Sequence, residues 1–173
     1  MNDAWLAQRL VDGDADALRQ AYRLYKHDLL TVAASILCDL HAAEDCVHDV
    51  FAQFAAGVKD VAVDRNLRGY LMRCVANRAK NMIKQQRVRR SGRVAETQEC
   101  QPSESPAGRL IATEQSVQVF QAMAQLPVEQ REVITLHLHA ELTFREIALQ
   151  LGHSINTVQS RYRYGIEKLR TLL

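Results

Sequence analysis

Residues 145–161, REIALQLGHSINTVQSR, contain two helical patterns separated by a Gly-His pair. Just before this stretch, Thr143 begins a capping-box pattern with Glu146, in which a hydroxyl and a carboxylate bind the unpaired backbone amides at a helix start. Gly152 permits the sharp turn, and Ser154 is a favoured N-cap for the last helix. This spacing predicts a helix-turn-helix.

The last helix has two unlike faces when it is drawn at about 100° per residue. The apolar face contains Ile155, Val158, Tyr162, Ile166 and Leu169. The opposite face carries hydroxyls, amides, guanidinium groups and one exposed ring, on Asn156, Thr157, Gln159, Ser160, Arg161, Arg163 and Tyr164. Arg and Gln can bind base edges, and hydroxyls at a helix N-terminus can hold phosphates. The pattern favours DNA reading over its alternative, an ordinary helical hairpin with a polar outer face.

The remainder of the 173-residue chain also has helical periodicity. Apolar residues recur at three- and four-residue spacing in 16–38, 41–56 and 67–90, and shorter helices are expected at 3–13, 110–126 and 127–139. Residues 91–108 contain two of the three prolines and little that could be buried, which is typical of a linker. We therefore predict an all-α protein with two small helical domains, 1–90 and 109–173, joined by a flexible linker at 91–108. The second domain contains the helix-turn-helix.

Charge is strongly segregated along the chain, although the formal net charge is only +2. Residues 1–64 contain five basic and eleven acidic side chains, whereas residues 65–93 contain ten basic side chains and no acidic one. A solvated helix face normally mixes charges of both signs. The segregation therefore indicates a polyanionic partner for the basic segment.

The sequence has no apolar run near the roughly 20 residues that span a bilayer, and its N-terminus lacks the pattern of a signal peptide. The cysteines show no CxxC spacing; they are Cys38, Cys46, Cys74 and Cys100. We expect a cytoplasmic protein with no membrane insertion, in which the cysteines are reduced and mostly fill small spaces in the core.

Three blocks of the sequence, taken together, resemble the sigma factors of bacterial RNA polymerase, specifically the two-domain extracytoplasmic-function group. They are HAAEDCVHDVFAQF (41–54), LRGYLMRCVANRAKNMIKQQRVRR (67–90) and LPVEQREVITLHLHAELTFREIALQLGHSINTVQSRYRYGIEKLR (126–170). They occur in the family's order and spacing. Tyr70 stands where the family commonly has Trp, and Gln159 and Tyr164 stand where it often has basic residues.

The resemblance implies a role for each block. The first block is similar to the segment that binds the β′ clamp of the polymerase core, which would use Glu44, Asp45, His48, Asp49 and Gln53. The second is similar to the segment that recognises and melts the −10 element, which would use Arg68, Arg73, Asn77, Lys80, Asn81, Lys84, Arg87, Arg89 and Arg90. Asn77 is the best single candidate for binding an extruded base, because an amide both donates and accepts hydrogen bonds.

The third block is similar to the domain that reads the −35 element. Its candidate residues are Arg145, Ser154, Asn156, Thr157, Gln159, Ser160, Arg161, Arg163 and Tyr164. The expected partners are the polymerase core and promoter DNA, and the family resemblance allows an anti-sigma factor as a third. Neither a cofactor nor a metal is expected.

Three other functions compete with this interpretation. A helix-turn-helix repressor or activator would bind duplex DNA without the polymerase, and it has no evident use for the basic segment. An enzyme is disfavoured because the sequence has no phosphate-binding loop or nucleophile elbow, and because His41, Glu44 or Asp45, and His48 lack the second ligand set of a di-metal bundle. A decoy that only binds a regulator is the third.

Overall fold

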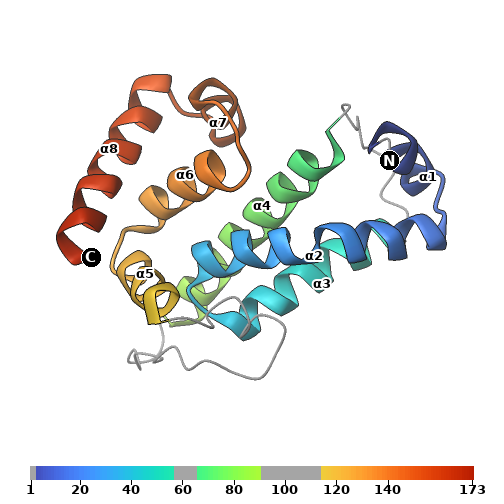
Figure 1. Cartoon of the computed structure of the whole chain (residues 1–173), viewed down its shortest axis with the longest axis horizontal. Coiled ribbons are helices and arrows are strands. Elements are labelled where there is room, and N and C mark those ends of the chain that lie inside the picture. Colours follow the sequence, from blue (N-terminus) through green and yellow to red (C-terminus); the bar gives the residue numbers. More distant parts are fainter. Residues whose placement is uncertain (1–2, 57–65, 91–113) are drawn as a thin grey trace.

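The computed structural model describes residues 3–56, 66–90 and 114–173, and the regular structure in these ranges is entirely helical (Figure 1). The helices are α1 (Asp3–Val11), α2 (Ala15–Leu37), α3 (Leu40–Ala55), α4 (Leu67–Arg90), α5 (Glu114–Ala124), α6 (Val128–Leu138), α7 (Phe144–Leu151) and α8 (Ile155–Leu172). The predicted all-α class is confirmed. The predicted linker at 91–108 and the predicted helix start at 110 lie outside the described residues.

Short polar side chains fix where the helices begin. Asp14 and Asp39 accept hydrogen bonds from backbone amides at the starts of α2 and α3, and Asn66 does the same for α4, at 2.8 Å from the Gly69 amide. The hydrogen bonds that the Asp14 carboxylate accepts from these backbone amides lower its pKa. Asp3 is the first residue of α1, and its carboxylate accepts a hydrogen bond from the Tyr25 hydroxyl at 2.8 Å. This bond ties α1 to α2.

The first half of the molecule is built on α2, which packs along both α3 and α4. Small side chains on the buried face of α2 let the helices approach closely; these include Ala17, Ala21, Ala33 and Ala34. Larger aliphatic side chains fill the space between the helices, and each contributes about 1.5–3 kcal/mol when it is fully buried. On α4 the buried apolar side chains are Leu67, Leu71, Met72, Val75, Ala76 and Ala79.

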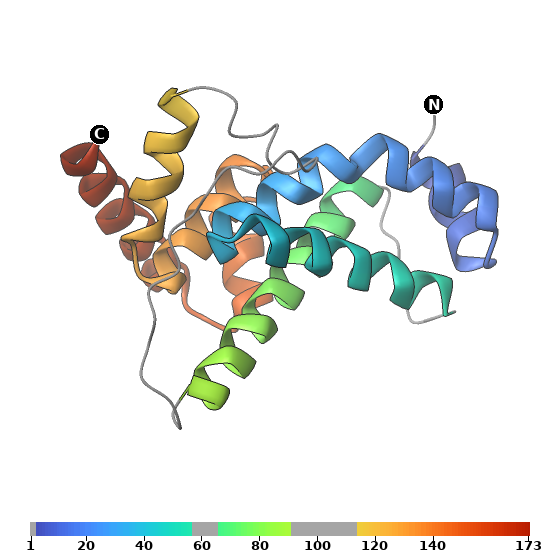
Figure 2. The ribbon, with the colours of Figure 1, turned by 90° about the horizontal axis from the view of Figure 1, so that it is seen from below.

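Helix α6 joins the two halves. It contacts α2 and α4 in the first half as well as α7 and α8 in the second, so six successive residues, 131–136, are buried. Figures 1 and 2 show α6 lying across α2 and α4, with α8 on the outer side and α1 at the far end of the molecule. The two predicted domains are therefore packed against each other, and residues of both share one apolar core.

The inner face of α8 differs in two positions from the predicted apolar stripe. Val158 is buried as expected, but Ile155 is 42% exposed at the start of the helix. The glycine at position 165, which the apolar pattern passed over, is buried against α6. A Cβ atom there would lie 2.6 Å from Cδ1 of Ile134 and 3.3 Å from Cβ of Gln130. Gly165 thus sets how closely α8 approaches α6.

We expect G165V to lower the free energy of unfolding by about 1–3 kcal/mol, the usual cost of overpacking a filled core. G165A should change it by less than about 1 kcal/mol, because the gain in helix propensity offsets a smaller clash that Ile134 can relieve by rotating. Urea unfolding followed by circular dichroism measures both changes. A G165V protein as stable as the wild type would contradict this account of the α6–α8 contact.

Candidate nucleic-acid and polymerase interfaces

The turn between α7 and α8 has the geometry that the capping pattern predicted. The Thr143 amide donates to a Glu146 carboxylate oxygen at 2.8 Å, and the Glu146 amide donates to the Thr143 hydroxyl at 3.3 Å. The hydrogen bonds that the Glu146 carboxylate accepts from the Thr143 amide and hydroxyl lower its pKa. Gly152 ends α7 with a φ of 66°, and the Ser154 hydroxyl accepts a hydrogen bond from the Thr157 amide at 3.1 Å. The helix-turn-helix is thus locally encoded at both of its helix starts.

Three rings from α6, α7 and α8 hold this unit together. The ring of His137 stacks on Phe144 at 4.4 Å between centroids, and Tyr162 meets both rings edge-on. His137 Nδ1 also lies 2.8 Å from the backbone oxygen of Leu142. This histidine therefore has a packing role inside the helix-turn-helix.

The outer face of α8 is open to solvent along the predicted reading residues. The exposed side chains are Asn156, Gln159, Arg163 and Tyr164, with Arg145 and Ser154 beside them; Thr157, Ser160 and Arg161 are half-buried. The Arg163 guanidinium lies 5.0 Å from the Tyr164 ring centroid, a cation–π contact that orients it. The structure therefore brings the predicted −35 residues together on one accessible surface at the N-terminal part of a helix.

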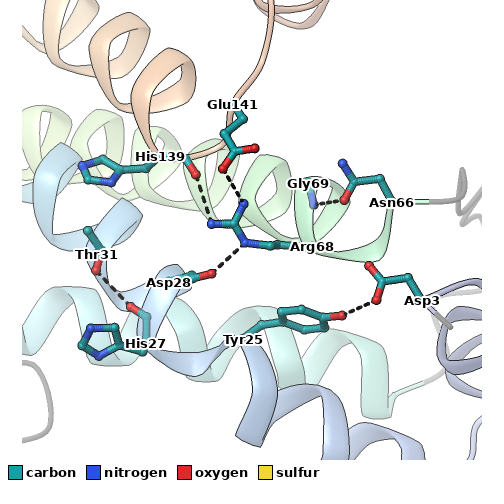
Figure 3. A network of polar contacts seen from close by, with 10 residues as sticks. All are labelled: Asp3, Tyr25, His27, Asp28, Thr31, Asn66, Arg68, Gly69, His139 and Glu141. Atoms are coloured by element: carbon teal, nitrogen blue, oxygen red, sulfur yellow. Dashed lines mark hydrogen bonds and ion pairs between the residues drawn. The ribbon is translucent and has the colours of Figure 1, made fainter. Parts of the chain in front are cut away.

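Arg68 connects α4 to both α2 and the α6–α7 turn (Figure 3). Its Nε donates to the Asp28 carboxylate at 2.7 Å, and its terminal nitrogens lie 3.5 Å from Glu141 Oε1 and from the backbone oxygen of His139. The partly exposed ion pairs contribute at most about 1 kcal/mol each. Arg68 was predicted to contact DNA, and in this structure it lies between the two halves.

Two other predicted −10 residues also meet the second half. Asn77 Oδ1 accepts a hydrogen bond from Gln150 Nε2 at 3.4 Å, and Lys80 Nζ lies 3.3 Å from Glu132 Oε2. The remaining members of the set are distributed along α4. Arg73 is half-buried, and Asn81, Lys84 and Arg87 are exposed towards its C-terminal end. Arg89 and Arg90 belong to α4, but their side chains lie outside the described part of the structure.

The predicted polymerase-binding residues lie along α3. Asp45, His48 and Gln53 are exposed; the ring of His48 also lies 3.2 Å from the Tyr22 hydroxyl, and Asp49 pairs with Arg78 at 2.5 Å. Glu44 is half-buried. Between α3 and α4 is an open hollow of about 380 Å³, lined by Asp45, His48, Asp49, Arg78, Met82, Gln85 and Gln86.

Sequence reasoning missed two charged residues on α6. Glu132 is only 1% exposed and Arg131 is 9% exposed, and both face the contact with the first half. Burial raises the pKa of Glu132, and the positive charges of Lys80 and Arg161 offset only part of that rise. Arg131 donates a hydrogen bond to the Cys38 thiol of α2. The sequence does contain an indication of this burial, because the apolar residues of α6 fall on no single face. Such a pattern is typical of a helix that packs against neighbours on several sides.

The cysteines behave as packing residues in the described part of the chain. Cys46 is buried, its thiol donates to the Val75 backbone oxygen at 3.5 Å, and burial raises its pKa to about 12. Burial also raises the pKa of Cys38 and Cys74, and none of these three thiols forms a disulfide in the described part of the chain. Cys100 lies outside the described residues.

Within residues 3–56, 66–90 and 114–173, the His, Cys, Asp and Glu side chains form no group of three or more that could hold a metal ion. No helix in the same ranges is long and apolar enough to cross a membrane.

Comparison with known families identifies both halves. The model of sigma-70 region 2 matches residues 21–89, and that of sigma-70 region 4 matches residues 122–171. The chain therefore belongs to the sigma-70 family, with region 2 in α2–α4 and region 4 in α6–α8. Within that family it is similar over nearly its whole length to extracytoplasmic-function factors, the group that the sequence indicated.

The relatives and solved structures agree with this assignment. The chain is 25% identical to the ECF RNA polymerase sigma factor SigW of Bacillus subtilis, over 93% of this chain and 91% of SigW. It is 26% identical to the RNA polymerase sigma-H factor of Pseudomonas aeruginosa, over 92% and 87%. Its fold is similar to that of RpoE from Bartonella quintana in a co-crystal structure with the anti-sigma factor NepR, with a TM-score of 0.67 and 22% identity over 89% of this chain and 94% of RpoE. It is also similar to that of CnrH in complex with the cytosolic domain of CnrY, with a TM-score of 0.68 and 24% identity over 98% of this chain and 96% of CnrH.

The buried carboxylate of α6 generates a stability prediction. E132Q should raise the free energy of unfolding near neutral pH by the order of 1 kcal/mol, because a neutral group of the same size has no charge to desolvate. Because the pKa of Glu132 is higher in the folded chain than in the unfolded chain, its charge destabilises the wild-type protein fully at a pH above the raised pKa. This destabilisation disappears as Glu132 becomes protonated and the pH falls towards the ordinary pKa of 4.5. The gain should therefore shrink in acid.

Urea unfolding at about pH 7.5 and about pH 4.5 measures this difference. The matched control is E129Q, which changes an exposed carboxylate two positions before the buried run 131–136 and should leave stability unchanged. An E132Q gain of equal size at both pH values, or a loss at neutral pH, would show that burial does not disfavour the Glu132 charge.

Proposed function

We propose that this chain directs RNA polymerase core to specific promoters and initiates transcription there, with region 2 opening the −10 element and region 4 reading the −35 element. The observation that carries the proposal is the pairing of two unlike DNA-facing helices in one sigma-70 chain. One is α4, in a segment with ten basic and no acidic side chains; the other is α8, with an exposed polar face. A protein that binds only duplex DNA needs the second but not the first.

Region 4 is proposed to place the start of α8 in the major groove. Asn156 and Gln159 are exposed near the helix N-terminus, where amides can contact base edges, and Arg163 lies one turn further on. Ser154 and Thr157 would hold the phosphate backbone together with the amides of the first turn. Arg145 on α7 and Tyr164 on α8 flank this surface.

Region 2 is proposed to hold the opened strand along α4. Lysine and arginine side chains would bind its phosphates, and this contribution should weaken steeply as the salt concentration rises. Asn77 is the candidate for an extruded base, with Lys80 and Asn81 beside it. Asp45, His48 and Gln53, which are exposed on α3, are proposed to meet the polymerase clamp, and a basic surface there would complement the acidic first part of the chain.

The domain organisation proposed for this task is 1–90 for clamp binding and −10 recognition, and 109–173 for −35 recognition, joined through 91–108. Linking two weak contacts raises the effective concentration of each at the other's site. We propose no chemistry for the chain itself, because nucleotide addition belongs to the polymerase. RpoE, one of the two solved structures named above, was co-crystallised with an anti-sigma factor, so a protein of this kind is a proposed third partner.

The experiment that tests the function is transcription of fragmented genomic DNA from the source bacterium by its own core polymerase, with and without the chain. We expect discrete RNA 5′ ends that appear only when the chain is added and that share two upstream sequence boxes. Sequencing those ends yields the promoter directly. If no such ends appear, and the chain alone footprints duplex DNA, the repressor or activator function replaces the sigma function.

The −35 contact can be tested on a promoter found in this way. Q159A should weaken use of that promoter by about 1–3 kcal/mol, the value of one amide contact to a base edge, and discrimination at one −35 base pair should be lost. The matched control is Q118A, an exposed glutamine on α5 outside the reading face. Promoter activity measured against each single −35 base change decides the matter; a uniform loss at all positions would assign Gln159 to the phosphate backbone.

A further inference from the structure

Glu132 is the most deeply buried charged side chain among the described residues, and it lies at the contact between regions 2 and 4. Its side chain is 1% exposed, and Lys80 Nζ of α4 lies 3.3 Å from its Oε2 atom. Within the described residues, neither of its carboxylate oxygens accepts a hydrogen bond. The ammonium of a side chain that is itself 44% exposed therefore faces a carboxylate that has lost its water and gained no hydrogen-bond donor.

The neighbouring charges do not replace this lost hydration. In the described part of the chain, the charged groups that act on Glu132 are Lys80 of α4 and Arg161 of α8, which favour its charge, and Glu129 of α6, which opposes it. Arg131 is adjacent on α6, but it donates its hydrogen bond to the Cys38 thiol of α2. Burial outweighs the two cations, so the pKa of Glu132 lies above its ordinary value while the regions are in contact.

The cover over Glu132 comes from both regions. Helix α6 packs on α2 and α4 of region 2 through its buried run 131–136, as well as on α7 and α8 of region 4. If region 4 separates from region 2, the carboxylate returns to water and its pKa returns towards the ordinary value of 4.5. The proton affinity of Glu132 therefore depends on whether the two regions are in contact. By linkage, the strength of the contact depends equally on the proton.

We propose that the contact between regions 2 and 4 is coupled to a proton on Glu132, so that the contact is tightest when this carboxyl group is protonated and loosens as the pH rises. Separation of the regions then releases a proton from Glu132 to the solvent. The inference rests on the proposed function, because the −10 strand would reach Lys80 only when Glu132 moves away from it.

The pH range of the effect follows from the two states of the chain. Well below pH 4.5, Glu132 is protonated whether or not the regions touch, and above its raised pKa it is charged in both states. The balance is independent of pH at both ends of the range. Between them the contact weakens as the pH rises, by up to about tenfold per pH unit for one proton. E132Q has nearly the same shape and no charge, so its contact should stay tight at every pH.

Strand binding to the free chain tests the proposal, because the strand and Glu132 compete for Lys80. The probe is a fluorescein-labelled oligothymidylate, followed by anisotropy at fixed salt from about pH 5 to about pH 8. The matched control is E129Q, which removes an exposed carboxylate from the same helix. Histidine protonation affects all the proteins alike and cancels in the ratio of their affinities.

We expect E129Q to bind the oligonucleotide at least about threefold more tightly than E132Q at about pH 8, and the ratio to shrink towards one at about pH 5. The wild type should follow E129Q. A ratio that does not change with pH would overturn the proposal.

Calorimetry measures the proton itself. Titration of each protein with the oligonucleotide in two buffers of different ionisation enthalpy gives the number of protons released on binding. E129Q should release a fraction of a proton more than E132Q within the pH range of the effect. Equal release from the two variants at every pH would contradict the coupling. If E132Q does not fold, E132A takes its place in this measurement, because it also lacks the titrating group.

Transcription with core polymerase separates this result from the proposed function. A wild-type chain that gives no promoter-specific starts contradicts the sigma function, whatever the proton release is. A wild-type chain that gives such starts, together with E132Q and E129Q proteins that release the same number of protons, leaves the function intact and removes the proton coupling.

Discussion

The burial of α6 is the constraint on which the rest of the structure depends. Six successive residues of this helix, 131–136, are buried, so the helix needs neighbours on most of its sides, and region 4 supplies α7 and α8. Helices α2 and α4 of region 2 complete the cover. Because α6 also carries Arg131 and Glu132 into that contact, the surface that joins the halves is both apolar and charged. The apolar groups stabilise this contact, and the desolvation of the two charges opposes it.

The electrostatics follow from the same arrangement. The chain separates its charges along the sequence, and the fold brings them back together: Arg68 meets Asp28, Arg78 meets Asp49, and Lys80 meets Glu132. Each basic residue of α4 that is paired in this way has an acidic partner on α2, α3 or α6. The exposed basic residues that remain, such as Lys84 and Arg87, lie towards the free end of α4. The positive potential available to a polyanion in the free chain is therefore concentrated there.

Much of this architecture could be predicted from the sequence because it is encoded locally. Caps such as Ser154, and the Thr143–Glu146 pair, fix the helix starts through atoms only three residues apart, and periodicity gave the inner face of α8 apart from Ile155 and Gly165. The burial of Glu132 depends instead on which helix faces lie against α6 in three dimensions. Its polar side chain looks like surface in a one-dimensional pattern, and only the pairing with Lys80, 52 positions earlier, makes it part of the interior.

The two DNA-facing helices consequently differ in how freely their residues can change. The outer face of α8 contributes little to the fold, since Asn156, Gln159 and Arg163 are exposed and their backbone is held by the cap and the inner face. Substitutions there can alter the promoter that is read without altering stability. On α4, Arg68 and Lys80 form contacts with the second half, so a change at either residue also changes the contact between the two halves. Promoter preference can therefore diverge more easily through region 4 than through the covered side of region 2.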